Sequence, residues 1–166
     1  MRYRGPLYRA INPLRAQQPL SGEGARLHGG RFNAKGQMAL YTSLSIMTAI
    51  RESSQIGTLQ PVTLVSYAAD IGPVFDATDE AALANFGMTP ADLAAEDWRI
   101  RMAKDGQSPT QAFAGRLIAD GHAAMLVLSF ARGAGESDLN MVLWRWGETL
   151  PAQLVLIDDE GRLGGG

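Results

Sequence analysis

The sequence predicts an α+β fold, with a single domain built on a mixed, mostly antiparallel sheet. Its 166 residues are 46% hydrophobic and 19% charged, which suits one domain with a substantial core. Short apolar runs typical of strands stand near both ends of the chain, and helix start signals gather between them. Early strands, a central helical block and late strands together favour an α+β arrangement.

The first half of the chain predicts four strands and one helix. The segment 15–30 is rich in Gly, Ser, Pro and Gln and predicts a loop. Ser43 or Ser45 can cap a helix that runs to about Gln55 and is ended by Gly57. Apolar and alternating runs predict the strands, at residues 7–11, 37–42, 61–69 and 74–77.

The second half predicts helices and then strands. A capping residue, followed at two of the three sites by proline, predicts helices over residues 79–85, 90–104 and 109–120. Two strongly apolar runs and a shorter one predict strands over residues 123–130, 139–146 and 152–158, with a flexible turn at 132–138. We place one domain at 1–160 and expect the tail, 161–166, to be flexible.

Composition excludes several classes of function. A net charge of −2 and a pI near 5.6 provide no electrostatic footprint for nucleic acid. The absence of cysteine excludes disulfides, thiolate catalysis and zinc–thiolate sites. With His28 and His122 as the only histidines, no metal site is expected, and a Ser-His-Asp triad would have to use one of them. No signal segment or membrane-length apolar run is visible, so we expect a cytoplasmic protein.

Positive charge is concentrated early in the chain, while acidic residues cluster from Asp70 onward. This asymmetry indicates that the N-terminal region meets an anion such as a phosphate-bearing small molecule, although ordinary surface charge is an alternative. The early basic residues are Arg2, Arg4, Arg9, Arg15, Arg26, Arg31 and Lys35.

Residues 29–53, GGRFNAKGQMALYTSLSIMTAIRES, hold two candidate binding residues. Arg31 follows two glycines, which permit close backbone approach, and its rigid fork suits phosphate or carboxylate. Tyr41 stands at the end of a predicted strand, where its ring can either stack on a ligand or pack in the core.

The predicted helix in this segment carries a third candidate, Glu52. A helical wheel directs Arg51 into water and places Glu52 on the rim of the packed face, beside Ala49 and Ile56. Such a rim is where a carboxylate that faces a cleft would lie. The alternative is that Glu52 is an ordinary glutamate exposed to solvent. The packed face comprises Ile46, Ala49, Ile50 and Ser53.

Two polar residues stand in otherwise apolar strands. Ser129 lies near the carboxyl end of AAMLVLSF, and Asn140 lies at the start of the next strand. Because buried polar groups need hydrogen-bond partners, each side chain either bonds to backbone or belongs to a site.

These segments together resemble the RES-domain family, named for its Arg, Glu and Ser residues. The resemblance begins at LYRAI, covers residues 29–53, and returns at LIADGHAAMLVLSF and LNMVLW, while residues 79–120 carry little of it. It implies an ADP-ribosyltransferase-like fold and an enzyme that consumes NAD as substrate, with no cofactor. The matching positions are Arg31, Tyr41, Glu52 and Ser129.

The resemblance implies a toxin of a type II toxin–antitoxin system that cleaves the nicotinamide–ribose bond. The reaction would be NAD hydrolysis, phosphorolysis or transfer of ADP-ribose to a protein, and Glu52 would supply an anion near the developing ribosyl cation. Arg31 would bind the phosphates or orient the ribose. The remaining expected NAD-binding residues are Tyr41, Ser129, Arg9 and Asn140.

The implied partner is a Xre-like antitoxin that covers the active site, in a complex where toxin chains pair. No membrane or direct nucleic-acid contact is expected. The alternatives are a non-catalytic module that binds NAD or a partner, and an RNase-type toxin, which the acidity and the scarcity of histidine disfavour. A Rossmann dehydrogenase is excluded because no G-x-G-x-x-G follows a strand.

Overall fold

The computed structural model describes residues 1–54 and 60–162, and within them the strands form one mixed sheet. The strand order is β4-β5-β6-β2-β1-β3-β7, and only β4 and β5 pair in parallel. The predicted α+β class is therefore confirmed. The strands are β1 (Tyr3–Ile11), β2 (Leu40–Ser43), β3 (Thr63–Ile71), β4 (Val74–Asp76), β5 (Ala124–Leu128), β6 (Leu139–Leu143) and β7 (Ala152–Leu156).

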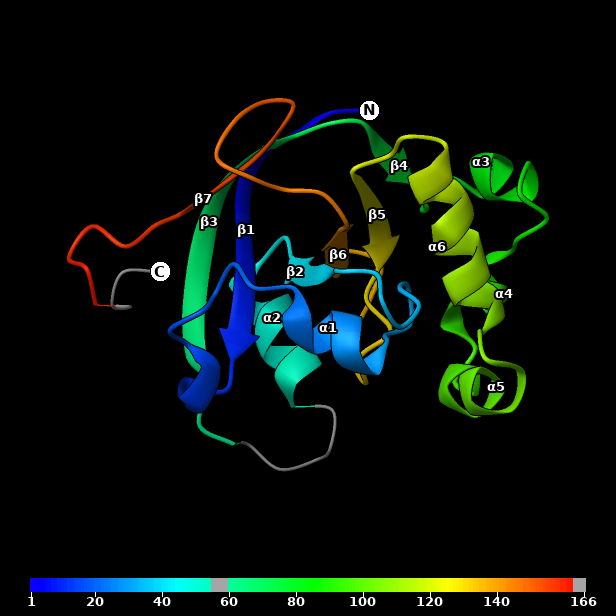
Figure 1. The fold of residues 1–166 in the computed structure, drawn as a ribbon, viewed down its shortest axis with the longest axis horizontal. Helices are drawn as coiled ribbons and strands as arrows, with labels where there is room; N and C mark the ends of the chain where they lie inside the picture. The colour runs from blue at the N-terminus through cyan, green and yellow to red at the C-terminus, as the bar shows by residue number, and fades with distance from the viewer. Residues whose placement is uncertain (55–59, 163–166) are drawn as a thin grey trace.

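The helices fall into two groups around this sheet. Four of them gather beside β4 and β5, and the other two lie near β1 and β2 (Figure 1). The first group is α3 (Glu80–Ala84), α4 (Pro90–Ala94), α5 (Trp98–Asp105) and α6 (Pro109–Ala119), and the second is α1 (Glu23–His28) and α2 (Ile46–Ser53). A short 3-10 helix, η1 (Pro13–Arg15), follows β1. Helix α2 packs on β1 and β2, near the middle of the sheet.

The central strands are buried on both faces. In β5, Ala124 and Leu126 join one hydrophobic core, while Met125 and Val127 join the other, which contains Phe113 of α6. This explains the uninterrupted apolar run, since a strand covered on both sides has no polar face. The run predicted as strand is longer than β5 because the chain leaves the sheet after Leu128.

The loop predicted for residues 15–30 is only partly correct, because it contains helix α1. Local signals for α1 are weak: its N-cap is Gly22, which makes no side-chain cap bond, and Gly24 lies inside the helix. Tertiary contacts supply the missing support. Asn33 Nδ2 donates to the carbonyl oxygen of Ala25 over 2.8 Å, and the Gly36 amide donates to that of Arg26 over 2.8 Å.

The single helix predicted over residues 90–104 is wrong, because it is two helices, α4 and α5, that break at Ala95. Arg31 Nη1 donates to the carbonyl oxygens of Leu93 and Ala95 over 2.9 and 2.7 Å. These carbonyls therefore bond to a side chain that is more than sixty residues distant in sequence, a partner that local pattern cannot reveal.

Helix α2 begins as predicted, with Ser45 Oγ accepting from the Thr48 amide over 3.1 Å. The predicted packed face is wrong in part, since Ile46 is 46% exposed while Thr48 is 1% exposed. Arg51 does not point freely into water, because its Nη1 lies 2.6 Å from Asp138 Oδ1. The described helix ends at Ser53, and Gln55, Ile56 and Gly57 lie outside the described residues.

Candidate functional site

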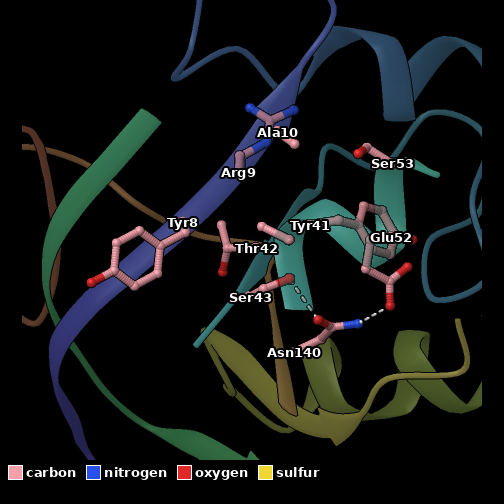
Figure 2. A pocket seen from close by; sticks show the side chains of 10 residues that line it. Tyr8, Arg9, Ala10, Tyr41, Thr42, Ser43, Glu52, Ser53 and Asn140 are labelled. Atoms are coloured by element: carbon pink, nitrogen blue, oxygen red, sulfur yellow. Dashed lines mark hydrogen bonds between the residues drawn. The ribbon is translucent and has the colours of Figure 1, made fainter. Parts of the chain in front are cut away.

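Glu52 is the centre of a hydrogen-bonded cluster that joins α2, β6 and the end of β5. Asn140 Nδ2 donates to Glu52 Oε1 over 2.6 Å, and Ser129 Oγ donates to the same oxygen. Asn140 is itself oriented by Ser43, whose hydroxyl donates to Asn140 Oδ1 over 2.8 Å (Figure 2). The Ala131 amide donates to Ser129 Oγ over 3.2 Å. The structure thus brings together three of the residues singled out from the sequence.

This arrangement fixes the carboxylate of Glu52 in one orientation at the rim of a cavity. Both donors act on a single oxygen, and hydrogen bonds to an ionised acceptor are about twice as strong as neutral ones. A carboxylate held in this way can stabilise a positive charge that develops beside it without first reorienting.

One edge of the Arg31 guanidinium is hydrogen-bonded to the protein, and the other edge is open to the cleft. Its Nη1 donates to the two α4 carbonyls described above, and its guanidinium carbon lies 5.0 Å from the centre of the Phe130 ring. Among the described residues, none accepts a hydrogen bond from Nε or Nη2. Burial, followed by the charge of Arg99, lowers the pKa of Arg31, but a guanidinium still keeps its proton at physiological pH. The open edge can therefore bind a phosphate or carboxylate.

Tyr41 combines a structural hydroxyl with a ring that lines the cleft. Its Oη accepts from the Phe32 amide over 3.0 Å and donates to Asn33 Oδ1 over 2.6 Å. Burial raises the pKa of Tyr41, so the hydroxyl stays protonated and can keep donating to Asn33. Asn33, a buried side chain that organises the turn carrying Arg31, was not singled out from the sequence.

We expect Gly30→Ala to lower the free energy of unfolding by about 1–3 kcal/mol, because the new methyl group overpacks this turn. A Cβ at Gly30 would lie 2.5 Å from Tyr41 Oη and 2.6 Å from Asn33 Oδ1. Gly115→Ala on α6 is the matched control, since nothing lies within 4 Å of its Cβ position. It should raise the free energy by about 0.5–1 kcal/mol. Urea unfolding measures both, and an unchanged midpoint for Gly30→Ala would contradict the expectation.

Three adjoining cavities form the cleft among the described residues. The central cavity, about 320 Å³, lies between β1, β2 and α2 (Figure 2). The α5-side cavity, about 270 Å³, reaches Arg31 and Trp98, and the α1-side cavity, about 680 Å³, reaches η1 and α1. Tyr41 lines all three cavities, while Glu52 lines the central and α5-side cavities. Each volume is of the order expected for part or all of a small-molecule ligand.

The early basic residues do not all face this cleft. Arg9, Arg15 and Arg31 line cavities, and Arg9 Nη1 also donates to the Pro19 carbonyl oxygen over 2.9 Å. Of the early basic residues, these three arginines therefore remain the candidates for anion binding in the cleft. Carboxylates pair with three others: Arg2 and Arg4 with Asp70, and Arg26 with Glu23.

Neither histidine forms a triad with Ser129, whose described partners are Glu52 and the Ala131 amide. The His122 ring packs edge-on against Phe75 at 5.5 Å, and His28 lies on the exposed wall of the α1-side cavity. Over residues 1–54 and 60–162, no three His, Asp or Glu side chains are grouped to hold a metal ion. None of the helices described in this structure has the length and apolar character needed to cross a membrane.

Asp138 ties α2 to the loop that follows Ser129, a role the sequence did not reveal. Its Oδ1 accepts from Thr48 Oγ1 over 2.7 Å and from Arg51 Nη1 over 2.6 Å, while its Oδ2 accepts from the Gly135 amide over 2.8 Å. The Ser129 amide donates to the Asp138 carbonyl oxygen over 2.8 Å. These hydrogen bonds of Asp138 therefore hold α2, which carries Glu52, beside Ser129.

We expect Asp138→Asn to destabilise the fold at neutral pH and much less in acid. The Gly135 amide and then the Thr48 hydroxyl hold the pKa of Asp138 below its ordinary value. A carboxyl with a depressed folded-state pKa stabilises the fold above its unfolded-state pKa of about 4, and this contribution is lost as pH falls through the folded-state value.

Urea unfolding of parent and Asp138→Asn at pH 7 and pH 3 checks this, with exposed Asp159→Asn as the control. The difference between parent and Asp138→Asn should shrink at pH 3. An equal difference at both pH values would show that the charge of Asp138 does not stabilise the fold.

Comparisons with known proteins identify the family and support the fold. The model of the RES domain matches residues 6–163, whereas no curated protein matches the chain. Seven chains of solved structures match it. One comes from the crystal structure of the M. tuberculosis MbcT–MbcA toxin–antitoxin complex. It is 23% identical, with 95% of this chain and 84% of that chain covered and a TM-score of 0.67.

The structural likeness shows the fold. The family match covers nearly the whole chain, including Glu52 and its partners Ser129 and Asn140. Because the matched region is 6–163, the chain belongs to the RES-domain family.

Proposed function

We propose that this chain cleaves the nicotinamide–ribose bond of NAD and acts as the toxin of a toxin–antitoxin pair. The observation that carries the reaction is the orientation of Glu52, with Ser129 and Asn140 both donating to one carboxylate oxygen beside two cavities. Membership of the RES-domain family supports this proposal, and so does the similarity to a chain from a toxin–antitoxin complex.

The chemistry needs an anion more than it needs a nucleophile from the protein. The bond between ribose C1′ and the nicotinamide nitrogen breaks, and its electron pair leaves with neutral nicotinamide. C1′ then carries positive charge, which the carboxylate of Glu52 offsets. An acceptor oxygen bonds to C1′ and loses its proton, which completes the transfer.

The other cleft residues bind and orient the substrate in this proposal. The open edge of Arg31 takes a phosphate oxygen or orients the ribose, and Arg9 supplies a further contact to phosphate. The ring of Tyr41 offers a wall against which a base or nicotinamide can stack. NAD is consumed, so the reaction belongs to the glycosyltransferase class rather than to redox chemistry.

Mass spectrometry of the products from NAD tests the reaction and identifies the acceptor. The purified chain is incubated with NAD alone, with inorganic phosphate, and with cell lysate. Free ADP-ribose indicates water as acceptor, ADP-ribose with a phosphate on the carbon that had carried nicotinamide indicates phosphate, and a mass-shifted protein indicates a side chain. Intact NAD in all three reactions would refute the proposal and favour a binding module.

A chain that consumes NAD in its own cell needs an inhibitor, and we propose a Xre-like antitoxin that covers the cleft between Arg31 and Glu52. The open edge of Arg31 fits a carboxylate-bearing contact from such a partner. Adding the antitoxin should reduce both NAD binding and nicotinamide release. Full NAD consumption in the presence of a tightly bound antitoxin would contradict occlusion.

A further inference from the structure

The α5-side cavity contains a second guanidinium, on a residue outside the segments that carry the family resemblance. Arg99 lies in the first turn of α5 and lines this cavity together with Arg31. Its guanidinium carbon lies 4.5 Å from the centre of the Trp98 ring, which is itself buried. Trp98 thus packs against the guanidinium group of an otherwise exposed arginine side chain.

Arg99 and Arg31 line the same cavity, and the positive charge of Arg99 acts on Arg31. The charge of Arg99 is the second cause, after burial, of the lowered pKa of Arg31, while the nearby carboxylates of Glu52 and Glu96 act in the opposite direction. Within residues 1–54 and 60–162, neither arginine forms an ion pair with a carboxylate. Like charges that face one cavity repel each other, and an anion bound between them would attract both and offset that repulsion.

The cavity contains groups of both charges. Arg31 and Arg99 line it together with Phe130 and Trp98, and Glu52 lines both this cavity and the central one. At about 270 Å³ it suits one end of a ligand whose remainder continues past Glu52. Two guanidinium forks are well matched to phosphate oxygens, which accept bidentate hydrogen bonds.

We propose that Arg99 and Arg31 form a phosphate subsite in the α5-side cavity, so that Arg99 is a further substrate-binding residue. This inference rests on the proposed NAD chemistry and deepens it. The phosphate belongs either to the diphosphate of the dinucleotide or to free inorganic phosphate that acts as acceptor. Both sources present phosphate oxygens to the arginines, so an experiment must distinguish between them.

The test compares Arg99→Gln with Arg101→Gln. Arg101 lies on the same helix and is exposed, but it does not line the cavity, so its variant removes the same charge from the same region. Isothermal titration calorimetry with inorganic pyrophosphate and with inorganic phosphate measures binding without turnover. Arg99→Gln should weaken binding of one or both anions by about tenfold or more, whereas Arg101→Gln should stay near the parent. Arg99→Lys, which keeps the charge, should recover part of the loss.

Steady-state kinetics then identifies the source of the phosphate. A raised KM for NAD in phosphate-free buffer supports the diphosphate, and a change confined to the phosphate dependence of the rate supports the acceptor. Equal behaviour of Arg99→Gln and Arg101→Gln in both measurements would overturn the subsite, as would a parent protein that binds neither anion. If the parent binds pyrophosphate through Arg99 but releases no nicotinamide, the subsite stands and the proposed reaction fails.

Discussion

Glu52→Gln is expected to reduce nicotinamide release from NAD by about 100-fold or more, because the anion beside the developing ribosyl cation is lost. The substitution keeps the side-chain oxygen to which Ser129 and Asn140 donate. The cluster should therefore remain assembled, and the loss should fall mainly on kcat. Steady-state release of nicotinamide, with circular dichroism as the check on folding, measures the effect.

Glu80→Gln is the matched control, since Glu80 is exposed in the first turn of α3 and lines none of the three cavities. It should retain the parent rate. A folded Glu52→Gln variant that releases nicotinamide nearly as fast as the parent would remove Glu52 from the catalytic role.

Arg31→Lys is expected to lower kcat/KM for NAD by about 10- to 100-fold, the range that follows from losing a charged, bidentate hydrogen bond. In the parent, Nη1 satisfies the carbonyls of Leu93 and Ala95 while the other edge stays open. A lysine has one ammonium group, so it cannot occupy those carbonyls and still present a fork to phosphate. It also loses the flat guanidinium face that stacks on Phe130.

Arg26→Lys provides the comparison, because Arg26 forms an exposed ion pair with Glu23 on α1. Such surface pairs contribute little, so this variant should behave like the parent. NAD kinetics of Arg31→Lys that match those of Arg26→Lys would assign Arg31 a structural role, with its α4 contacts as its main function.

Local chemistry made much of the fold predictable. Ser45, one of the two caps considered for α2, and Ser108, which precedes the helix predicted from residue 109, both cap their helices, because a side-chain oxygen ahead of a helix can accept from its first amides. Ser129 and Asn140 were recognisable as site candidates because a polar side chain in a buried strand needs a partner. Both donate to Glu52, the candidate that the helical wheel had placed at a rim.

The remaining features depend on partners that are distant in sequence. The break between α4 and α5 coincides with the contact of Arg31 with Leu93 and Ala95, and it contains neither glycine nor proline, only the N-cap Asp97. Arg51 does not extend freely into solvent, because Asp138, 87 residues away, accepts a hydrogen bond from it. Arg99 had no motif to distinguish it, and only the fold places it in the same cavity as Arg31.

The most direct test of the central claim follows NAD by proton NMR in the presence of the purified chain, with Glu52→Gln in parallel. The account predicts that the nicotinamide resonances of NAD are replaced by those of free nicotinamide over many turnovers, and that the variant leaves NAD intact over the same period. If the parent binds NAD and the dinucleotide nevertheless remains whole, the cleft captures its ligand without cleaving it.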